Sequence, residues 1–172
     1  QYNGYYETIP EYNTAINTYA TWVVGKGWET DPEMQVILEH VIGWGEDTFL
    51  SILWNMIVAK KVQGDAFAEI IRDEKTGIII NIKPLSTLRV VVNKKGKLKR
   101  YEQVTTAGEI KKFKPEEILH LCNERVFDNI HGSAITKKIE WVILARNEAL
   151  NDKRRLMHRG TIRVMEVDEE DK

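Results

Sequence analysis

The sequence predicts an α+β fold: N-terminal helices, then an antiparallel meander sheet, then one long, projecting C-terminal helix. Three observations lead to this prediction. Apolar residues recur with a helical period between residues 10 and 62, and short apolar runs separated by turn residues follow between 66 and 122. From 133 to 160 the helical period returns without an internal proline or glycine. Helices and strands that occupy separate parts of a chain are typical of α+β proteins.

The N-terminal region is expected to form an arm and three helices. Residues 1–8 show no hydrophobic period and predict an arm, whereas Pro10 can open a helix that runs to about Val24. Asp31, followed by proline and glutamate, is a start signal for a second helix, which should stop at Gly43. A third helix, from 46 to about 62, carries the most hydrophobic face of the chain, formed by Phe49, Leu50, Leu53, Trp54, Ile57 and Val58.

Six short strands are expected after the third helix. Turn residues at 73–77 and 93–96 predict hairpins, and Pro84 is expected to break the second strand. Because consecutive strands joined by turns usually pair with each other, they should form an antiparallel meander. The predicted strands are 66–72, 78–82, 88–92, 98–104, 110–113 and 118–122.

The C-terminal helix is expected to run from 133 to 160, with Ser133 as its N-cap and Gly160 as its stop. At 1.5 Å per residue it measures about 40 Å, too long for a compact domain of this size to bury fully. Its second half is polar nearly all round. Such a helix juts into solvent or packs against copies of itself, so we interpret it as a projecting, assembly-forming helix.

Composition is that of an ordinary folded protein. The 172 residues are 42% hydrophobic and 30% charged, and no apolar run is long enough to span a membrane. Cys122 is the single cysteine, which excludes an internal disulfide and suits a reducing compartment. The first 50 residues hold eight acids against one lysine, and bases are in excess afterwards, which favours neighbouring chains or a polyanion as partners.

His120, Cys122 and His131 are the candidates for a metal site or a nucleophilic Cys–His pair. A structural zinc ion usually needs four ligands, and one cysteine with two histidines falls short. Cys122 lies in an apolar predicted strand, where an inert buried thiol is commoner than a nucleophile. The glycines do not match the spacing of a phosphate-binding loop. We therefore expect no catalytic residue, no metal and no cofactor.

Four bases crowd the last turns of the long predicted helix. Cations at a helix C-terminus complement the helix dipole, which would give these bases a structural role. The functional interpretation is contact with nucleic acid phosphates or with an acidic neighbour. The four bases are Lys153, Arg154, Arg155 and Arg159.

Several stretches carry a resemblance to a known family. Residues 64–73 read GDAFAEIIRD, 82–85 read IKPL, 113–121 read FKPEEILHL after Tyr101, and 131–135 read HGSAI. In this order they resemble the G-N-A-Y-x-E-I-x-R-D strand, the L-x-P-L turn, the Y … F-x-P-E-E-I-I-H segment and the G-x-S-x-L helix start of the portal proteins of tailed bacteriophages and related archaeal viruses. The resemblance extends over residues 44–160, and Asp65 stands where the family usually has asparagine.

The resemblance implies a structural subunit and not an enzyme. Such subunits form a homo-oligomeric ring, usually of twelve, at one capsid vertex, and double-stranded DNA passes through the ring during packaging and ejection. The implied partners are the terminase ATPase, capsid proteins and head–tail connector proteins, with no membrane involved. The implied location is the virion and, during assembly, the host cytoplasm.

The resemblance also implies a division of the chain. Residues 1–30 would form an N-terminal arm and helix, 31–130 the wing-like α+β domain, 131–160 the first stem helix and 161–172 the start of the clip. A portal protein continues with a second stem helix and a crown, so we expect this chain to be an excerpt of a longer polypeptide.

Two alternatives remain open. The first is a stand-alone DNA-binding or adaptor module that uses the basic helix. The second is a hydrolase in which Cys122 and a histidine form the nucleophilic pair, which an aligned pair in a cleft would favour.

Overall fold

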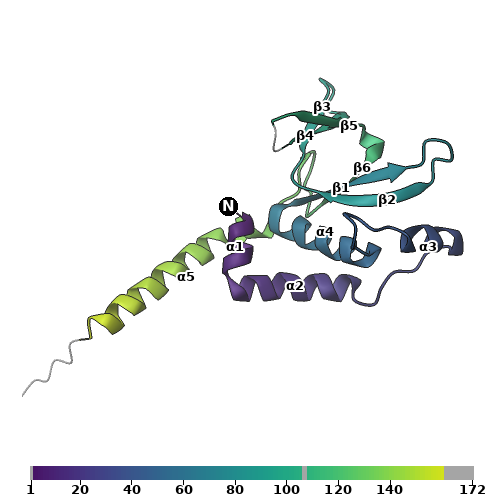
Figure 1. The fold of residues 1–172 in the computed structure, drawn as a ribbon. Helices are drawn as coiled ribbons and strands as arrows, with labels where there is room; N and C mark the ends of the chain where they lie inside the picture. Colours follow the sequence, from purple (N-terminus) through teal and green to yellow (C-terminus); the bar gives the residue numbers. More distant parts are fainter. Residues whose placement is uncertain (1, 106–107, 161–172) are drawn as a thin grey trace, which may run out of the picture. The chain divides into compact units, whose positions relative to one another are not determined.

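The computed structural model describes residues 2–105 and 108–160 (Figure 1). This described part contains five α-helices and two antiparallel sheets, which confirms the predicted α+β class and the long C-terminal helix. The chain divides into two compact units, Gln1–Lys137 and Lys138–Lys172. None of the described helices is both long and apolar enough to cross a membrane. The clip-like segment expected at 161–172 lies outside the described residues.

The first unit begins with two packed helices, α1 (Tyr2–Thr8) and α2 (Pro10–Val24), and α2 has the bounds that the sequence predicts. The expected arm at the N-terminus is wrong, because contacts with α2 hold this segment as a helix. Tyr6 Oη donates to Asn17 Oδ1 at 2.6 Å, and Asn13 Nδ2 donates to the Tyr6 carbonyl at 3.2 Å. These contacts depend on tertiary packing, which a search for local hydrophobic period does not detect.

The third helix, α3 (Pro32–Glu39), begins where predicted but ends before the expected stop at Gly43. The chain beyond it bonds to the sheet instead of continuing the helix. Asn81 accepts the Gly43 N–H and donates to the Gly43 carbonyl, both at 2.9 Å. Val41, expected on the helix face, is buried in the core from this non-helical segment.

The fourth helix, α4 (Phe49–Gln63), begins after a capping box in which Thr48 and Ser51 satisfy each other's backbone N–H groups. Its buried face matches the predicted one in part: Ile57 and Val58 are buried as expected, whereas Leu50 is exposed. The helix lies between α2 and the first sheet (Figure 1), so apolar residues surround it and no single stripe identifies the core side. Its buried residues are Ile52, Met56, Ile57, Val58 and Val62.

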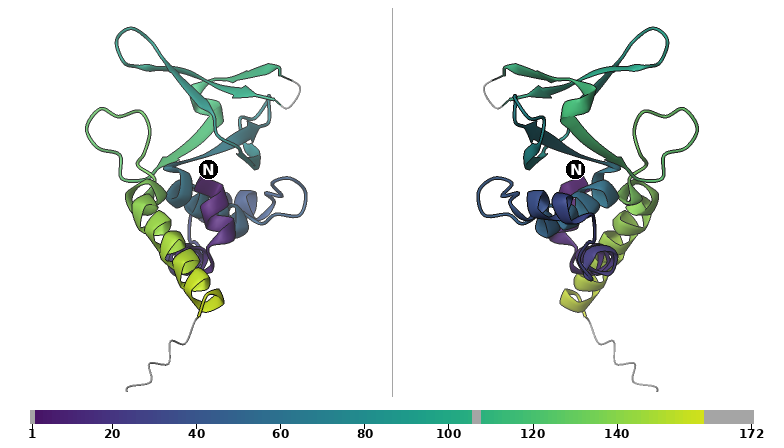
Figure 2. Two further views of the ribbon diagram at one scale, coloured as in Figure 1. Left: turned by 90° about the vertical axis from the view of Figure 1, so that its left-hand side faces the viewer. Right: turned by 90° about the vertical axis from the view of Figure 1, so that its right-hand side faces the viewer.

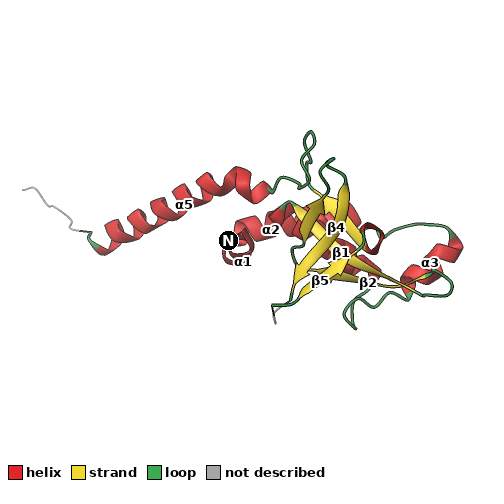
Figure 3. Cartoon of the chain, turned by 90° about the horizontal axis from the view of Figure 1, so that it is seen from above, coloured by secondary structure: helices red, strands yellow, loops and turns green. Residues whose placement is uncertain are grey.

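Six strands divide between two antiparallel sheets. The first sheet has the order β2-β1-β6, with β1 at Asp65–Arg72, β2 at Ile79–Leu85 and β6 at Ile118–Cys122. The second has the order β3-β4-β5, with β3 at Arg89–Val92, β4 at Leu98–Val104 and β5 at Ile110–Phe113. Seen from above, the second sheet lies over the first (Figure 3).

Two details of the predicted meander need correction. After the short 3-10 helix η1 (Pro115–Glu117), β6 returns to the first sheet and pairs with β1, so it does not extend the meander β3-β4-β5. Pro84 does not break β2 but lies within it, opposite Ala68. Because β2 is an edge strand, the N–H that proline lacks is not needed for a second neighbour.

Two apolar clusters hold these layers together. Because successive side chains of a strand point to opposite faces, Ala66 and Ala68 of β1 face α4, whereas Phe67 faces the second sheet. The cluster between α4 and the first sheet contains Leu38, Val41, Ile52, Met56, Ala66, Ala68 and Ile82. The cluster between the two sheets contains Phe67, Leu88, Tyr101, Phe113 and Ile118.

The long helix α5 (Ile135–His158) follows a loop at residues 123–134, drawn in green in Figure 2. It begins two residues later than expected, so Ser133 is not its N-cap. The backbone N–H of Ser133 donates to the Asn123 carbonyl at 2.7 Å, which holds the segment before the helix to the end of β6.

Gly132 approaches the backbone of two other segments, at Gly64 and Asn123, so closely that a larger residue should destabilise the fold. An added Cβ would clash with the Gly64 carbonyl oxygen and stand 2.5 Å from the backbone nitrogen of Asn123. We expect Gly132→Ala to lower the free energy of unfolding by about 2–3 kcal/mol, because neither backbone can move without losing hydrogen bonds. Urea denaturation measures the change. Gly4→Ala, in open space on α1, is the control and should be neutral or stabilising; equal stability of the two variants would contradict the close approach.

Candidate functional site

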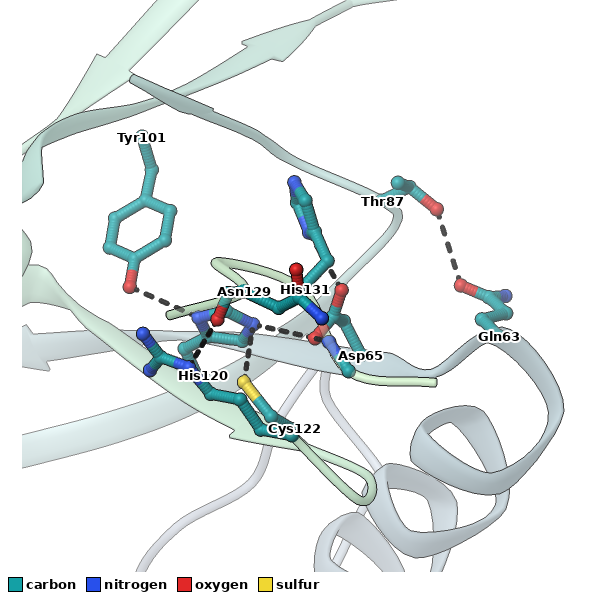
Figure 4. A network of polar contacts seen from close by, with 10 residues as sticks. Gln63, Asp65, Thr87, Tyr101, His120, Cys122, Asn129 and His131 are labelled. Atoms are coloured by element: carbon teal, nitrogen blue, oxygen red, sulfur yellow. Dashed lines mark hydrogen bonds and ion pairs between the residues drawn. The ribbon is translucent and has the colours of Figure 1, made fainter. Parts of the chain in front are cut away.

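Polar side chains of the first unit gather where three segments meet: the start of β1, the end of β6 and the loop before α5 (Figure 4). Hydrogen bonds between residues far apart in the sequence connect these segments. We call this meeting point the junction, and its residues are Asp65, Tyr101, His120, Cys122, Asn123, His131, Gly132 and Thr136.

Asn123 fixes the backbone of the junction. Its N–H donates to the Gly64 carbonyl at 2.8 Å, and its carbonyl accepts the Ser133 N–H. Its side-chain Nδ2 donates to the Ser133 carbonyl at 2.7 Å. Asn123 is 1% exposed, so these bonds have little competition from water. One buried residue therefore joins the end of α4, the end of β6 and the segment before α5.

Thr136 ties the start of α5 to two other helices of the same unit. Its hydroxyl is completely buried and donates to the Val62 carbonyl near the end of α4 at 2.7 Å. Because the single hydroxyl proton is used there, the 2.6 Å contact with Tyr12 must have the tyrosine as donor. Burial raises the pKa of Tyr12, which keeps its phenol in the protonated, donating form.

Asp65 is the charged centre of the junction. Its side chain is 11% exposed and its oxygens contact three groups: His120 Nε2 at 3.0 Å, the Gly132 N–H at 2.9 Å and His131 Nδ1 at 2.7 Å. Burial alone would raise the pKa of Asp65. Hydrogen bonds from His120, Gly132, His131 and Cys122 outweigh that penalty and lower the pKa to about 2, so the carboxylate is ionised at neutral pH.

His120 is held in place on both ring nitrogens and on its face. Its ring stacks on Phe67, the residue opposite it on β1, at 4.4 Å between centroids. Nδ1 lies 3.3 Å from the hydroxyl of Tyr101, and Nε2 faces both Asp65 Oδ1 and Cys122 Sγ. The imidazole therefore has one fixed position, with Nε2 directed at a carboxylate and a thiol.

This geometry does not fit a nucleophilic cysteine. In a Cys–His–carboxylate arrangement, one ring nitrogen receives the thiol proton while the carboxylate orients the other nitrogen. Here Asp65 and Cys122 contact the same nitrogen, Nε2. Burial raises the pKa of the Cys122 thiol, and the hydrogen bond with Asp65 raises it further. The junction thus works against formation of a free thiolate.

The sequence singled out three of the polar side chains that meet at the junction. His120, Cys122 and His131 come together as a group, around a carboxylate from Asp65 that the sequence analysis noted only as a departure from a family pattern. The strand register supplies the missing signal, because Asp65 lies directly opposite Cys122. That pairing joins residues on strands β1 and β6, and nothing local in the sequence indicates it.

The four bases at the end of α5 belong to the second unit. All four are exposed, and Arg155 lies 3.8 Å from Asp152. Asp152 is the only acid between residues 151 and 160, so this end of the helix carries a clear excess of positive charge. Two large apolar side chains, Leu156 and Met157, are exposed beside the bases, which are Lys153, Arg154, Arg155 and Arg159.

Solved structures similar to this chain include chains of gene transfer agent (GTA) particles. A chain of the native GTA virion has a TM-score of 0.60 and 15% identity, over 79% of this chain and 37% of that chain. Chains from the neck of the native particle, computed with C12 symmetry, and of the empty particle, computed with C6 symmetry, each match with TM-score 0.60 and 15% identity over 78% of this chain and 36% of theirs. At this identity the likeness establishes the fold, and this chain spans little more than a third of those chains. No family model and no curated protein matches the sequence.

Acid titration tests the electrostatics of the junction. Since the pKa of Asp65 falls from 3.8 to about 2 on folding, its contribution to stability is present above pH 4 and lost as the pH falls towards 2. Allowing for partial screening by solvent, the free energy of unfolding should fall by about 1–2 kcal/mol from this group. Asp65→Asn should remove this part of the pH dependence, whereas Glu116→Gln, at an exposed ion pair, should keep it. Denaturation between pH 6 and pH 2 measures it, and parallel profiles for Asp65→Asn and the parent protein would refute the assignment.

Proposed function

We propose that this chain forms the wing and first stem helix of a portal subunit, in a ring through which double-stranded DNA enters and leaves a capsid. The observation that carries the proposal is the likeness of its fold, over most of its length, to chains of GTA virions and necks. A neck computed with C12 symmetry agrees with the twelve-subunit ring implied by the family resemblance.

The resemblance in sequence supports the same proposal from a different direction. The stretches 64–73, 113–121 and 131–135 lie far apart in the chain, yet they supply β1, β6 and the segment before α5, and they meet at the junction. Motifs that converge on one structural feature are better support than motifs scattered over a surface, because a shared fold explains their common order and spacing.

The proposal includes partners and location. A portal subunit contacts copies of itself, capsid proteins and head–tail connector proteins, and a terminase supplies the energy for DNA movement. It would reside in the virion, after assembly in the host cytoplasm.

The basic end of α5 has a specific role in this proposal. Repeated around a ring, Lys153, Arg154, Arg155 and Arg159 would form a belt of positive charge. Each phosphate neutralised by such a belt adds close to one unit of salt dependence, so a complete belt would clamp DNA that must slide. We therefore propose that acids of neighbouring subunits, or those at 168–171, outside the described residues, neutralise most of these bases.

The test uses the full-length polypeptide and two double variants. Electron microscopy counts rings, and DNA binding is measured as a function of salt. We expect the parent protein to form rings and Arg154→Ala/Arg155→Ala to reduce them several-fold, with little change in DNA affinity. Lys94→Ala/Lys95→Ala, in the exposed turn between β3 and β4, removes the same charge elsewhere and should assemble normally.

Two outcomes would overturn the proposal. Absence of rings from the full-length parent protein would remove the portal function. Normal rings for Arg154→Ala/Arg155→Ala, together with far weaker DNA binding and a salt slope shallower by about one unit per lost contact, would make the bases a DNA grip. Far weaker DNA binding by Arg154→Ala/Arg155→Ala, with a parent protein that forms no rings, would favour the stand-alone DNA-binding module.

A further inference from the structure

We propose that Asp65, His120 and Cys122 bind one divalent transition-metal ion, and that their chemistry selects Zn²⁺. The inference does not depend on the portal proposal. It rests on the convergence of a carboxylate oxygen, an imidazole nitrogen and a thiol sulfur, which all lie within 4.8 Å of one another.

The spacing of the three donor atoms is close to that of a metal site. Donors around a tetrahedral zinc ion lie about 3.3–3.8 Å apart. His120 Nε2 is 3.3 Å from Cys122 Sγ and 3.0 Å from Asp65 Oδ1, so these two pairs need only small outward shifts to admit an ion, and the third pair lies within 4.8 Å. The same feature that excludes a catalytic relay, namely two groups facing one nitrogen, is what a shared metal ion requires.

Rigid elements present the three donors. His120 and Cys122 are two residues apart on β6, so their side chains emerge on the same face of the sheet, and Asp65 lies opposite Cys122 on β1. The Gly132 N–H and His131 hold the carboxylate of Asp65 from the loop side. His131 is half exposed and is not among the converging donors, so we assign it a positioning role, with water in the fourth coordination position.

The residues that contact the His120 ligand resemble those that surround histidine ligands of bound zinc. A histidine that binds zinc through one nitrogen usually donates its other N–H to an oxygen. The Tyr101 hydroxyl oxygen stands 3.3 Å from His120 Nδ1 and is positioned to accept a hydrogen bond from that N–H. The stack on Phe67 restricts rotation of the ring. Tyr101 is 4% exposed, so this outer contact is itself fixed by the core.

Donor type and charge favour Zn²⁺ over other ions. Magnesium and calcium prefer oxygen ligands alone, whereas one sulfur, one nitrogen and one oxygen suit zinc. On binding, the Cys122 thiol releases its proton to solvent, and the resulting thiolate with the Asp65 carboxylate balances the two charges of the ion. The expectation of no metal site considered only one cysteine and two histidines as ligands. Asp65 adds a carboxylate ligand that the expectation left out.

One of the three proposed ligands borders a surface cleft. Asp65 lines a cleft of about 300 Å³, together with Tyr2, Gln63, Phe67 and Thr87. Asp65 and His120 are 11% and 12% exposed in their side chains, which leaves them reachable but mostly desolvated. A bound ion would connect β1 to β6 directly, and through Asp65 it would strengthen the hold on the loop before α5.

The experiment titrates Zn²⁺ alone into the chelator-treated full-length protein, with a competing indicator. We expect one ion per chain. Asp65→Asn and Cys122→Ser, which keep the size of the side chain, should weaken binding at least about 100-fold, and Tyr101→Phe about 10-fold or more. His158→Ala, an exposed histidine on α5, is the matched control and should bind as the parent does. Circular dichroism establishes that each variant is folded.

Cobalt supplies an independent readout of the sulfur ligand. Co²⁺ bound at the junction should show thiolate-to-metal charge-transfer absorption, and loss of that absorption in Cys122→Ser assigns it to Cys122. The proposal is overturned if the parent protein binds no Zn²⁺ in the micromolar range, or if Co²⁺ gives no thiolate absorption. It is equally overturned if His158→Ala loses as much Zn²⁺ affinity as Cys122→Ser, because the ion would then lie elsewhere.

Discussion

The buried hydrogen bonds of Asn123 are the constraint on which the rest of the first unit depends. They join the Gly64 carbonyl, at the end of α4, to the backbone of Ser133, just before α5. A buried polar group without a partner costs about 1–3 kcal/mol, so this part of the chain has few alternative arrangements. Within the described residues no buried side-chain polar atom lacks a partner. With Asn123 in place, Gly132 reaches the carboxylate of Asp65, and Thr136 reaches the last turn of α4.

The junction is polar because the ends of three elements meet there and their backbone groups need hydrogen-bond partners. The side chains that supply or surround these hydrogen bonds include groups that can ionise or bind a metal. Apolar clusters cover both faces of β1, but neither can satisfy the backbone at the ends of α4, β1 and β6. The backbone N–H of Asn123 and the Thr136 hydroxyl bond to the end of α4, and the side chains of Asp65 and Asn123 bond to the loop before α5, at Gly132 and Ser133. An ionised Asp65 in turn draws His120, Cys122 and His131 towards it. The hydrogen bonding of the backbone and the proposed metal binding are therefore two consequences of one arrangement.

The sequence predicted those features that depend on neighbouring residues. The bounds of α2 and the strands β1, β4, β5 and β6 follow from period and turn residues, and the basic end of α5 is visible directly. Features set by distant partners were missed: Tyr6 of α1 bonds to Asn17 of α2, α3 ends because Asn81 binds Gly43, and β6 pairs with β1. Asp65 belongs to this second group, since only the pairing of two distant strands reveals its partners. The roles of the four bases remain predictions.

Native-state hydrogen exchange tests the central claim most directly, because it measures the stability of the junction amide by amide. The N–H groups of Asn123, Gly132 and Ser133 should exchange as slowly as those of the central strand β1, only through global unfolding. The exposed turn at 94–96 provides the fast reference within the same molecule. Exchange of the three junction amides at the rate of that turn would show that the loop before α5 opens independently, and would contradict the account.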